Sequence, residues 1–133
     1  MADAARGEDS PRRRLPRARR ITAGTEIRAL IQRGKRSRTA HLDVFDSASP
    51  VAYPRVGIIV PKHRRNSVER NKLKRRIREV LRLEVLPRLM EHEAHVDLLV
   101  RARREAYNAT YDQLHDELTD LAEKKWSRAR SSH

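Results

Sequence analysis

Large apolar side chains are scarce in this chain, and this scarcity limits the core that it can form. Apolar residues make up 38% of its 133 residues, and five of them are aromatic: one Phe, one Trp and three Tyr. A chain of this length can bury one layer of helices against a sheet within a single domain. We therefore expect no large enclosed substrate cavity.

The spacing of the apolar residues predicts helices and strands in a mixed order. A first helix is expected from about Thr22 or Thr25 to Arg33, with a Thr N-cap, an apolar stripe on the sheet, and Gly34 as its stop signal. Alternation and β-branched residues predict four strands, at residues 35–38, 40–46, 55–60 and 95–101. In the second strand, one face is expected to lie in the core and the other is not.

Two further helices are predicted from helical periodicity. One runs from Ser67 to about Leu83, and Pro87 is expected to end or kink it. The last helix starts at Thr110, which forms a capping box with Gln113 ahead of leucines at helical spacing. The expected fold class is therefore α+β, a single-domain two-layer sandwich of helices on a sheet of about four strands.

Both ends of the chain are predicted to lie outside the folded domain. Residues 1–20 contain two prolines and three consecutive arginines without a sustained apolar period, which is typical of a disordered basic arm. Residues 21–125 form the expected domain, and residues 126–133 form a flexible tail.

Charge and cysteine content narrow the possible partners. The chain has 31 Lys and Arg against 18 Asp and Glu, a net charge of +13, which favours nucleic acid first and an anionic membrane surface second. No apolar run approaches the roughly 20 residues of a spanning helix, and there is no signal peptide, so we expect a soluble, cytoplasmic protein. The absence of cysteine excludes disulfides, thiolate zinc sites and cysteine nucleophiles.

The positive charge is concentrated in residues 62–82, which hold ten basic residues against Glu69 and Glu79. A charge run is most often a solvated helix face. Here, however, like-charged pairs four residues apart, such as Lys74 with Arg78, cost roughly a few tenths of a kcal/mol each. Phosphate groups would offset this repulsion, and Asn71 adds an amide able to contact sugar hydroxyls or base edges. The segment is therefore predicted to bind nucleic acid.

Residues 70–79, RNKLKRRIRE, contain an Arg-Asn pair followed by Lys-Arg and a further Arg. This pattern resembles the signature helix of the ribonuclease P protein family. Residues 56–62 and 66–68 are similar to the strand and loop that precede this helix in the family. A weaker similarity extends from Arg20 to about Leu121. The resemblance implies the element order αβββαβα, with a left-handed βαβ crossover around the basic helix.

The resemblance also implies a function. In that family, an RNA subunit hydrolyses the phosphodiester bond at the 5′ end of the mature tRNA with bound Mg²⁺, and the protein supplies affinity and positioning. The chain is thus expected to be a subunit of a tRNA-processing endoribonuclease, with the catalytic RNA and precursor tRNA as its partners. No membrane or obligate protein partner is expected. Mg²⁺ is expected to be held mainly by the RNA, and the protein is assigned no catalytic residue and no metal ligand.

Two binding surfaces follow from the resemblance. The surface that faces the catalytic RNA is expected to use the basic helix and its preceding loop, through Arg64, Arg65, Asn66, Arg70, Asn71, Lys74, Arg75 and Arg78. A cleft between the first helix and the sheet is expected to take the single-stranded 5′ leader, through Ile27, Ile31, Phe45, Lys62 and Arg103. Ile27 and Ile31 stand where the family often has Phe, so only Phe45 could stack on a base, an interaction worth about 1–3 kcal/mol. We therefore expect apolar contact and charge to hold the leader, although a core position explains Ile31 at least equally well.

Three other interpretations stay open. A structural RNA-binding protein, of the ribosomal or RNA-chaperone type, explains the charge but not the ordered signature. A nuclease that acts without RNA needs a catalytic constellation. None is recognisable, because the six His lack zinc-protease spacing and residues 91–95 resemble a polar linker more than a metal site. A membrane-surface protein is a poor description of a strand-rich chain.

Overall fold

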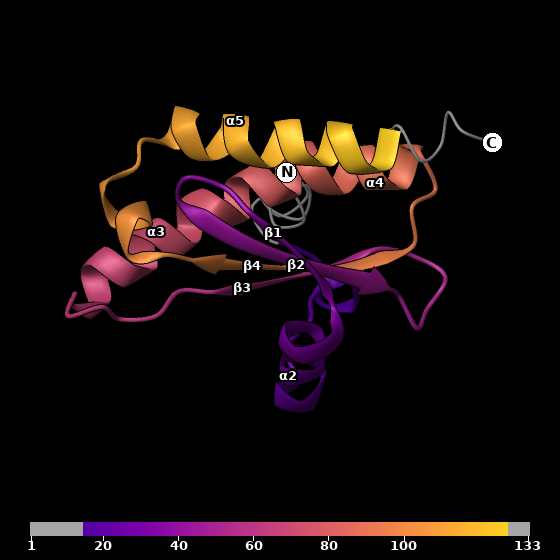
Figure 1. Cartoon of the computed structure of the whole chain (residues 1–133), viewed down its shortest axis with the longest axis horizontal. Coiled ribbons are helices and arrows are strands. Elements are labelled where there is room, and N and C mark those ends of the chain that lie inside the picture. Colours follow the sequence, from indigo (N-terminus) through magenta and orange to yellow (C-terminus); the bar gives the residue numbers. More distant parts are fainter. Residues whose placement is uncertain (1–14, 128–133) are drawn as a thin grey trace, which may run out of the picture.

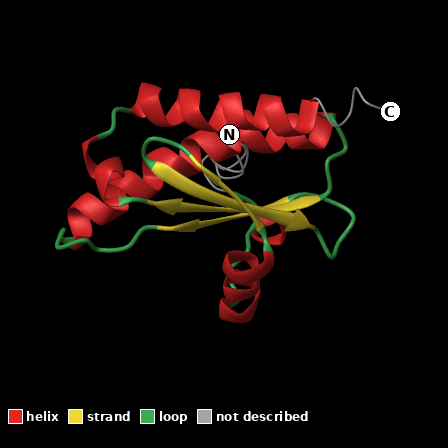
Figure 2. Ribbon diagram, in the orientation of Figure 1, coloured by secondary structure: helices red, strands yellow, loops and turns green. Residues whose placement is uncertain are grey.

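The computed structural model describes residues 15–127, which form a four-stranded sheet with helices on both faces (Figures 1 and 2). Across the sheet, the strands are β1 (Lys35–Arg38), β2 (Leu42–Ala48), β4 (Val96–Ala102) and β3 (Arg55–Ile59). Strand β2 is antiparallel to both of its neighbours, and β3 is parallel to β4. The predicted α+β class and four strands are confirmed.

Three helices cover one face of the sheet. Helix α3 (Ser67–Val80) continues through a π-helical turn, η2 (Leu81–Val85), into α4 (Leu86–Glu91), and α5 (Tyr111–Ala122) packs beside them. Helix α2 (Gly24–Arg33) lies on the opposite face (Figure 1). The connection through α3 and α4 joins two neighbouring parallel strands, β3 and β4, and so completes a βαβ unit.

Two clusters of apolar side chains correspond to the two faces. The larger cluster lies between the sheet and α3–α5 and includes Leu42, Val44, Val56, Leu73, Ile77, Leu98, Val100, Leu114 and Leu118. The smaller cluster lies under α2 and consists of Ile21, Leu30, Phe45 and Leu99, with Ile27, Ile31 and Ile59 packed against it. Helix α2 therefore lays its apolar stripe on the sheet, as predicted.

Strand β2 differs from its prediction because both of its faces are covered. Leu42 and Val44 face the larger core, while Asp43 and Phe45 are only 4% and 2% exposed on the other side. The sequence pattern predicts one solvent-facing side. That prediction is wrong because α2 packs over Phe45 on the second face and three arginine side chains contact Asp43 there.

The ends of helix α2 are set by backbone geometry more than by side-chain capping. Its N-cap is Ala23, which makes no side-chain cap hydrogen bond, so the predicted Thr cap is wrong. Gly34 follows the helix with an extended backbone, at φ −68°. A Cβ atom at this position would lie 2.5 Å from the Leu30 carbonyl oxygen and 3.2 Å from that of Asp46. Gly34 is thus required by the close approach of β2 and the helix end.

Pro87 neither ends the helical path nor breaks it. It lies in the first turn of α4, directly after the π-helical turn η2. A proline lacks the N–H of the helical ladder, and its ring clashes with the carbonyl four residues earlier. The wider π turn gives the ring room, so the helical path continues to Glu91 beyond the predicted limit near Leu83.

The folded part of the chain extends beyond the predicted domain limits of residues 21 and 125. Leu15 and Trp126 are 3% and 7% exposed and belong to the larger core. Residues Arg17–Arg19 form a short 3-10 turn, η1. The rest of the predicted arm and tail, residues 1–14 and 128–133, lies outside the described residues.

Candidate nucleic-acid interface

Helix α3 begins with a capping box that its sequence neighbours complete. The Asn66 side chain accepts a hydrogen bond from the Glu69 backbone N–H at 2.8 Å, and the Asn66 N–H donates to Glu69 Oε1 at 3.2 Å. Arg65 donates to the other oxygen of Glu69 at 3.0 Å. These contacts, the Asn66 backbone first and Arg65 second, hold the pKa of Glu69 below its ordinary value. Asn66 and Arg65, both predicted RNA contacts, thus also fix the start of the helix.

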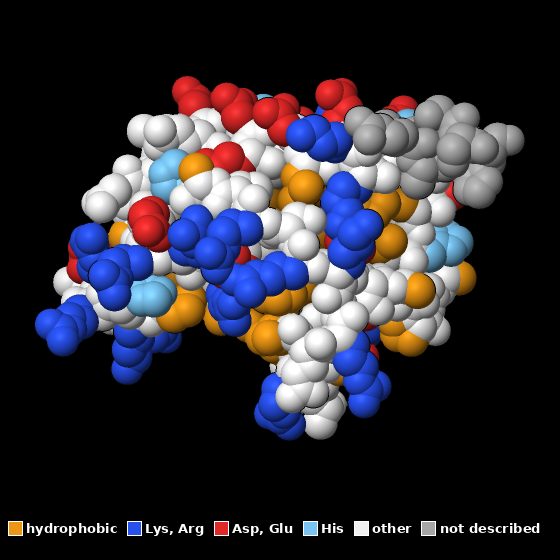
Figure 3. Space-filling model, in the orientation of Figure 1, with side chains coloured by type: hydrophobic (Ala, Val, Ile, Leu, Met, Phe, Trp, Pro, Cys, Tyr) orange, Lys and Arg blue, Asp and Glu red, His pale blue; other side chains and the backbone are white. Residues whose placement is uncertain are grey.

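The outer face of α3 carries exposed cations. Leu73, Ile77 and Val80 are buried against the sheet, as the periodicity predicts. The structure brings the predicted RNA-facing residues together on the other side, with Arg64, Asn71, Lys74 and Arg75 exposed and Arg70 and Arg78 half-buried. Figure 3 shows Lys and Arg gathered where α3 begins and Asp and Glu along α5 at the opposite edge. The face seen in Figure 3 therefore has a polarised charge distribution.

The cations of this segment divide into two groups. Arg76 donates to the Ala109 carbonyl at 3.2 Å, and Arg82 forms an ion pair with Glu79 at 2.6 Å. These two, and Arg65 through its ion pair with Glu69, are committed to contacts within the protein. Within residues 15–127, no carboxylate forms an ion pair with the second group, which comprises Lys62, Arg64, Arg70, Lys72, Lys74, Arg75 and Arg78. That group is available to an external polyanion.

The loop before α3 has an unusual backbone that Tyr107 holds. His63 and Arg64 adopt positive φ angles of 47° and 67°, which cost L-residues roughly 1–2 kcal/mol each. The Tyr107 hydroxyl donates to the Pro61 carbonyl at 2.6 Å, and its ring lies under the guanidinium of Arg65 at 5.1 Å. Burial raises the pKa of Tyr107. The sequence gives no sign of this role, because Tyr107 lies in η3 (Arg104–Asn108), which follows β4.

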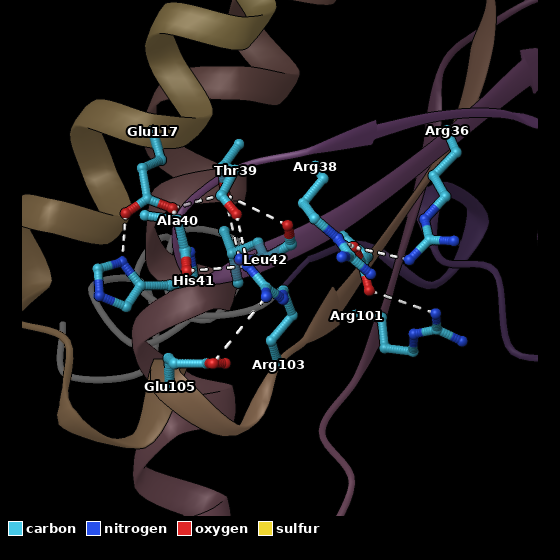
Figure 4. A network of polar contacts seen from close by, with 11 residues as sticks. Arg36, Arg38, Thr39, Ala40, His41, Leu42, Arg101, Arg103, Glu105 and Glu117 are labelled. Carbon is cyan, nitrogen blue, oxygen red and sulfur yellow. Dashed lines mark hydrogen bonds and ion pairs between the residues drawn. The ribbon is translucent and has the colours of Figure 1, made fainter.

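A second cationic group lies on the face of the sheet that α2 covers in part. Three guanidinium groups converge on the buried carboxylate of Asp43: Arg38 at 3.0 Å, and Arg36 and Arg101 each at 3.3 Å (Figure 4). Burial alone would raise the pKa of Asp43, but the hydrogen bonds from Arg38, Arg101 and Arg36 outweigh it and lower the pKa. One buried negative charge therefore fixes three partly exposed positive charges, and we call these four residues the Asp43 cluster.

Phe45 lies beneath two members of this cluster. Its ring centre is 5.0 Å from the Arg101 guanidinium and 5.9 Å from that of Arg36. With only 2% of its surface exposed, the ring presents no free face to a nucleobase in this arrangement. Ile27 and Ile31 are half-buried and pack against the smaller apolar cluster under α2, to which Phe45 belongs. All three predicted leader-binding apolar residues are thus together, with Phe45 as the buried base of the group.

The remaining predicted leader contacts lie near the ends of the strands. Arg103 donates to the carbonyl oxygens of Thr39 and Ala40 at 2.9 and 3.0 Å (Figure 4). A cavity of about 490 Å³ lies beside it and is lined by residues that include Asp43, Pro61, His63, Arg101 and Arg103. Lys62 is exposed and is not among the lining residues.

Arg36, Arg38 and Arg101 have no recognisable sequence signal. They meet because β1, β2 and β4 are neighbours in register, with Arg38 and Arg101 both opposite Asp43. Residues distant in the chain are thus brought to one point by strand order. No local sequence pattern could have predicted that these three arginines meet at Asp43.

The turn between β1 and β2 is clamped to α5 by Glu117. Its carboxylate accepts hydrogen bonds from the Thr39 hydroxyl at 2.5 Å and from the His41 N–H at 3.1 Å, and it also contacts His41 Nδ1 (Figure 4). Glu117 therefore has a structural role. Among residues 15–127, no group of three or more His, Asp or Glu side chains is placed to hold a metal ion. The helices in this part of the chain include none with the length and apolar composition of a membrane span.

Comparisons with known proteins find a matching family and similar relatives. The family model described as Ribonuclease P matches residues 15–126. The chain is 32% identical over 111 residues to the ribonuclease P protein component of Syntrophus aciditrophicus, covering 84% of this chain and 90% of the relative. It is 33% identical over 123 residues to that of Mycobacterium sp. strain KMS, covering 89% and 98%.

A solved structure gives the same result for the fold. The ribonuclease P protein of Staphylococcus aureus superposes with a TM-score of 0.64 at 27% identity, covering 81% of this chain and 96% of that protein. The match of the family model reaches both buried ends of the fold, Leu15 and Trp126. The chain therefore belongs to the ribonuclease P protein family.

Proposed function

We propose that this chain acts in ribonuclease P by holding two RNA segments on two separate cationic surfaces. As a family member, it is the protein component of a tRNA-processing endoribonuclease, and it has an RNA partner. The finer assignment concerns which RNA binds where. The observation that carries it is the separation of the unpaired cations of α3 from the Asp43 cluster on the other face of the sheet.

The α3 surface is assigned to the catalytic RNA. Most of its exposed cations project from a helix whose other side is fixed in the core, so the backbone positions that carry them are fixed relative to one another. Phosphate groups would relieve their mutual repulsion and release condensed counterions. The full set is Arg64, Arg65, Asn66, Arg70, Asn71, Lys74, Arg75 and Arg78. Of these, Arg65 and Asn66 act mainly by fixing the start of α3.

The surface between α2 and the sheet is assigned to the 5′ leader of precursor tRNA. Arg36, Arg38 and Arg101 supply phosphate contacts, joined by Lys62 and Arg103 near the strand ends. Ile27 and Ile31 supply apolar contact. Phe45 supports the site from below and does not stack on a base, because two guanidinium groups cover its ring. Charge thus dominates leader binding.

The chemistry is assigned to the RNA subunit, as the family resemblance implies. Mg²⁺ would supply charge neutralisation and an activated water there, and we assign it no protein ligand. The protein lowers the repulsion between two RNA polyanions that must approach each other, so its contribution is greatest when Mg²⁺ is scarce. We also propose that this activity takes place in the cytoplasm, as expected from the sequence.

Binding to the transcribed catalytic RNA tests the assignment of α3. Replacing Arg75 by Ala should weaken binding and reduce the slope of log K against log salt by about 0.7–0.9, the value for one lost phosphate contact. The matched control is Lys124→Ala, which removes an exposed charge beyond α5. Equal effects of the two variants would contradict the assignment and favour a general electrostatic RNA-binding protein.

A further inference from the structure

The segment before α2 is attached to the edge of the sheet. Arg20 forms a parallel bridge with Val56 of β3, and the Ile21 N–H donates to the Val56 carbonyl at 2.8 Å. Gly57 permits this close approach, since a Cβ atom there would lie 3.1 Å from the Ile21 carbonyl oxygen. Arg20 is therefore held at a defined place beside β3, although the sequence predicts it within a disordered arm.

A small cavity lies where this segment, β3 and α3 meet. Its volume is about 170 Å³. Its apolar lining comes from Leu15, Ile21, Val56 and Ile58, and its polar lining from Thr22, Arg20, Lys74 and Arg78. The three cations thus come from two elements that are more than 50 residues apart in the chain.

The charge of this cavity distinguishes it from the other arginine cluster. Arg36, Arg38 and Arg101 share the carboxylate of Asp43, whereas no acidic residue lines this cavity. Within the described part of the chain, Arg20, Lys74 and Arg78 also form no ion pair elsewhere. Three converging cations without a carboxylate repel one another, and an external anion would relieve that repulsion.

The lining determines which anion fits. A duplex presents phosphates along its backbone and needs no apolar pocket, whereas an unpaired nucleotide offers a phosphate, a ribose and an apolar base face together. The volume lies below the roughly 300 Å³ of sites for drug-sized ligands, so it suits a single inserted group and not a whole cofactor. Thr22 adds a hydroxyl that can contact a base edge or the ribose.

We propose that this cavity holds one unpaired nucleotide of the RNA that binds α3, with its base against the half-buried Ile58 and its phosphates on Arg20, Lys74 and Arg78. This inference rests on the proposed function, because it extends the α3 surface to the segment before α2. It assigns Arg20 to RNA binding. It also explains why an otherwise peripheral segment is fixed to β3 beside the basic helix.

The test uses the full chain labelled with ¹⁵N and two probes, single-stranded hexauridylate and a blunt RNA duplex without unpaired nucleotides. Hexauridylate should shift the amide resonances of Ile21, Thr22 and Ile58, and the duplex should not. Arg20→Ala should weaken hexauridylate binding about three- to tenfold, the loss of one hydrogen-bonded contact from an exposed side chain. Arg20→Lys should restore most of it. The matched control Arg17→Ala removes an exposed charge three residues earlier and should have little effect.

Three results would overturn the inference: no shift at the three amides, equal shifts with both probes, or equal weakening by Arg20→Ala and Arg17→Ala. The affinity of the unaltered chain for the catalytic RNA is measured alongside. If that affinity is high while the hexauridylate results are negative, the inference alone fails. If the catalytic RNA does not bind at all, the proposed function fails first.

Discussion

The Tyr107 hydroxyl donates a hydrogen bond to the Pro61 carbonyl at 2.6 Å, and this contact joins η3 to the loop that leads into α3. The same ring lies under Arg65 at 5.1 Å and meets the His63 ring edge-on at 6.3 Å. The Tyr107 side chain thus holds both ends of the loop, Pro61 and Arg65, between which two residues have positive φ angles. The positions of Arg64 and Arg65, the first cations of the proposed RNA surface, depend on it.

Tyr107→Phe should lower both stability and RNA affinity while keeping the aromatic ring. Loss of the hydrogen bond leaves the Pro61 carbonyl without that donor and should reduce the free energy of unfolding by about 0.5–1.5 kcal/mol. Urea denaturation and binding to the catalytic RNA would measure the two effects. Tyr111→Phe is the matched control, because no hydrogen bond of its hydroxyl is recorded among residues 15–127, and it should change neither quantity. A neutral result for both variants would contradict the loop-holding role.

Asp43→Asn should destabilise the protein in a pH-dependent way. Asp43 has a lowered pKa in the folded state, so its contribution is fully present above the unfolded pKa of about 3.9 and is lost as pH falls through the folded value. The variant should cost about 1–3 kcal/mol at pH 7, since three charged hydrogen bonds lose their shared acceptor charge. Its stability should then decline less steeply than that of the unaltered chain below pH about 4. Parallel curves across the acid range would show that Asp43 does not stabilise the fold electrostatically.

Arg38→Ala should weaken binding of precursor tRNA more than binding of mature tRNA. The side chain is 55% exposed, so its removal is expected to spare the core. Loss of one contact to the single-stranded leader should reduce the salt slope for the precursor by about 0.7 and leave that for mature tRNA unchanged. Arg33→Ala, at the exposed end of α2, provides a matched loss of charge. The same effect on both tRNAs would remove Arg38 from the leader site.

Phe45→Ala should act on stability more than on base stacking. A fully buried Phe replaced by Ala typically costs about 3–5 kcal/mol, because apolar contacts are lost and a cavity remains. Chemical denaturation would measure this loss, and Phe45→Leu should retain most of the stability. If Phe45→Leu is as stable as the unaltered chain but binds precursor tRNA much more weakly, the ring contacts the leader directly, and the supporting role is wrong.

Local features of the fold were predictable from the sequence, whereas features that depend on long-range packing were not. The capping box of Thr110 with Gln113 is confirmed, because its hydrogen bonds join residues three apart. The buried face of α3 follows from its own periodicity. In contrast, the burial of Phe45 depends on α2 packing over β2. The meeting of Arg38 with Arg101 depends on strand order, which periodicity does not encode.

The ends of the domain show a related limit. Leu15 lies between Arg14 and Pro16, and an isolated apolar residue in such a stretch gives no periodic signal. Trp126 lies four residues after Ala122 and continues the buried stripe of α5, so its position did carry a periodic signal that the predicted limit at residue 125 left out. Both are buried because the larger core offers them a place. The predicted RNA-facing residues did come together on α3, since their pattern is confined to one helix and its preceding loop.

Cleavage of a precursor tRNA at its 5′ end, assayed at low Mg²⁺, tests the central claim most directly. The arms are the catalytic RNA alone, the protein alone, both together, and the RNA with an Arg75→Ala plus Arg78→Ala variant or with an Arg17→Ala plus Lys124→Ala control. We predict efficient cleavage only for the RNA with the unaltered or control protein, and loss of that gain with the α3 variant. Cleavage by the protein alone, or no gain from adding the protein, would contradict the account.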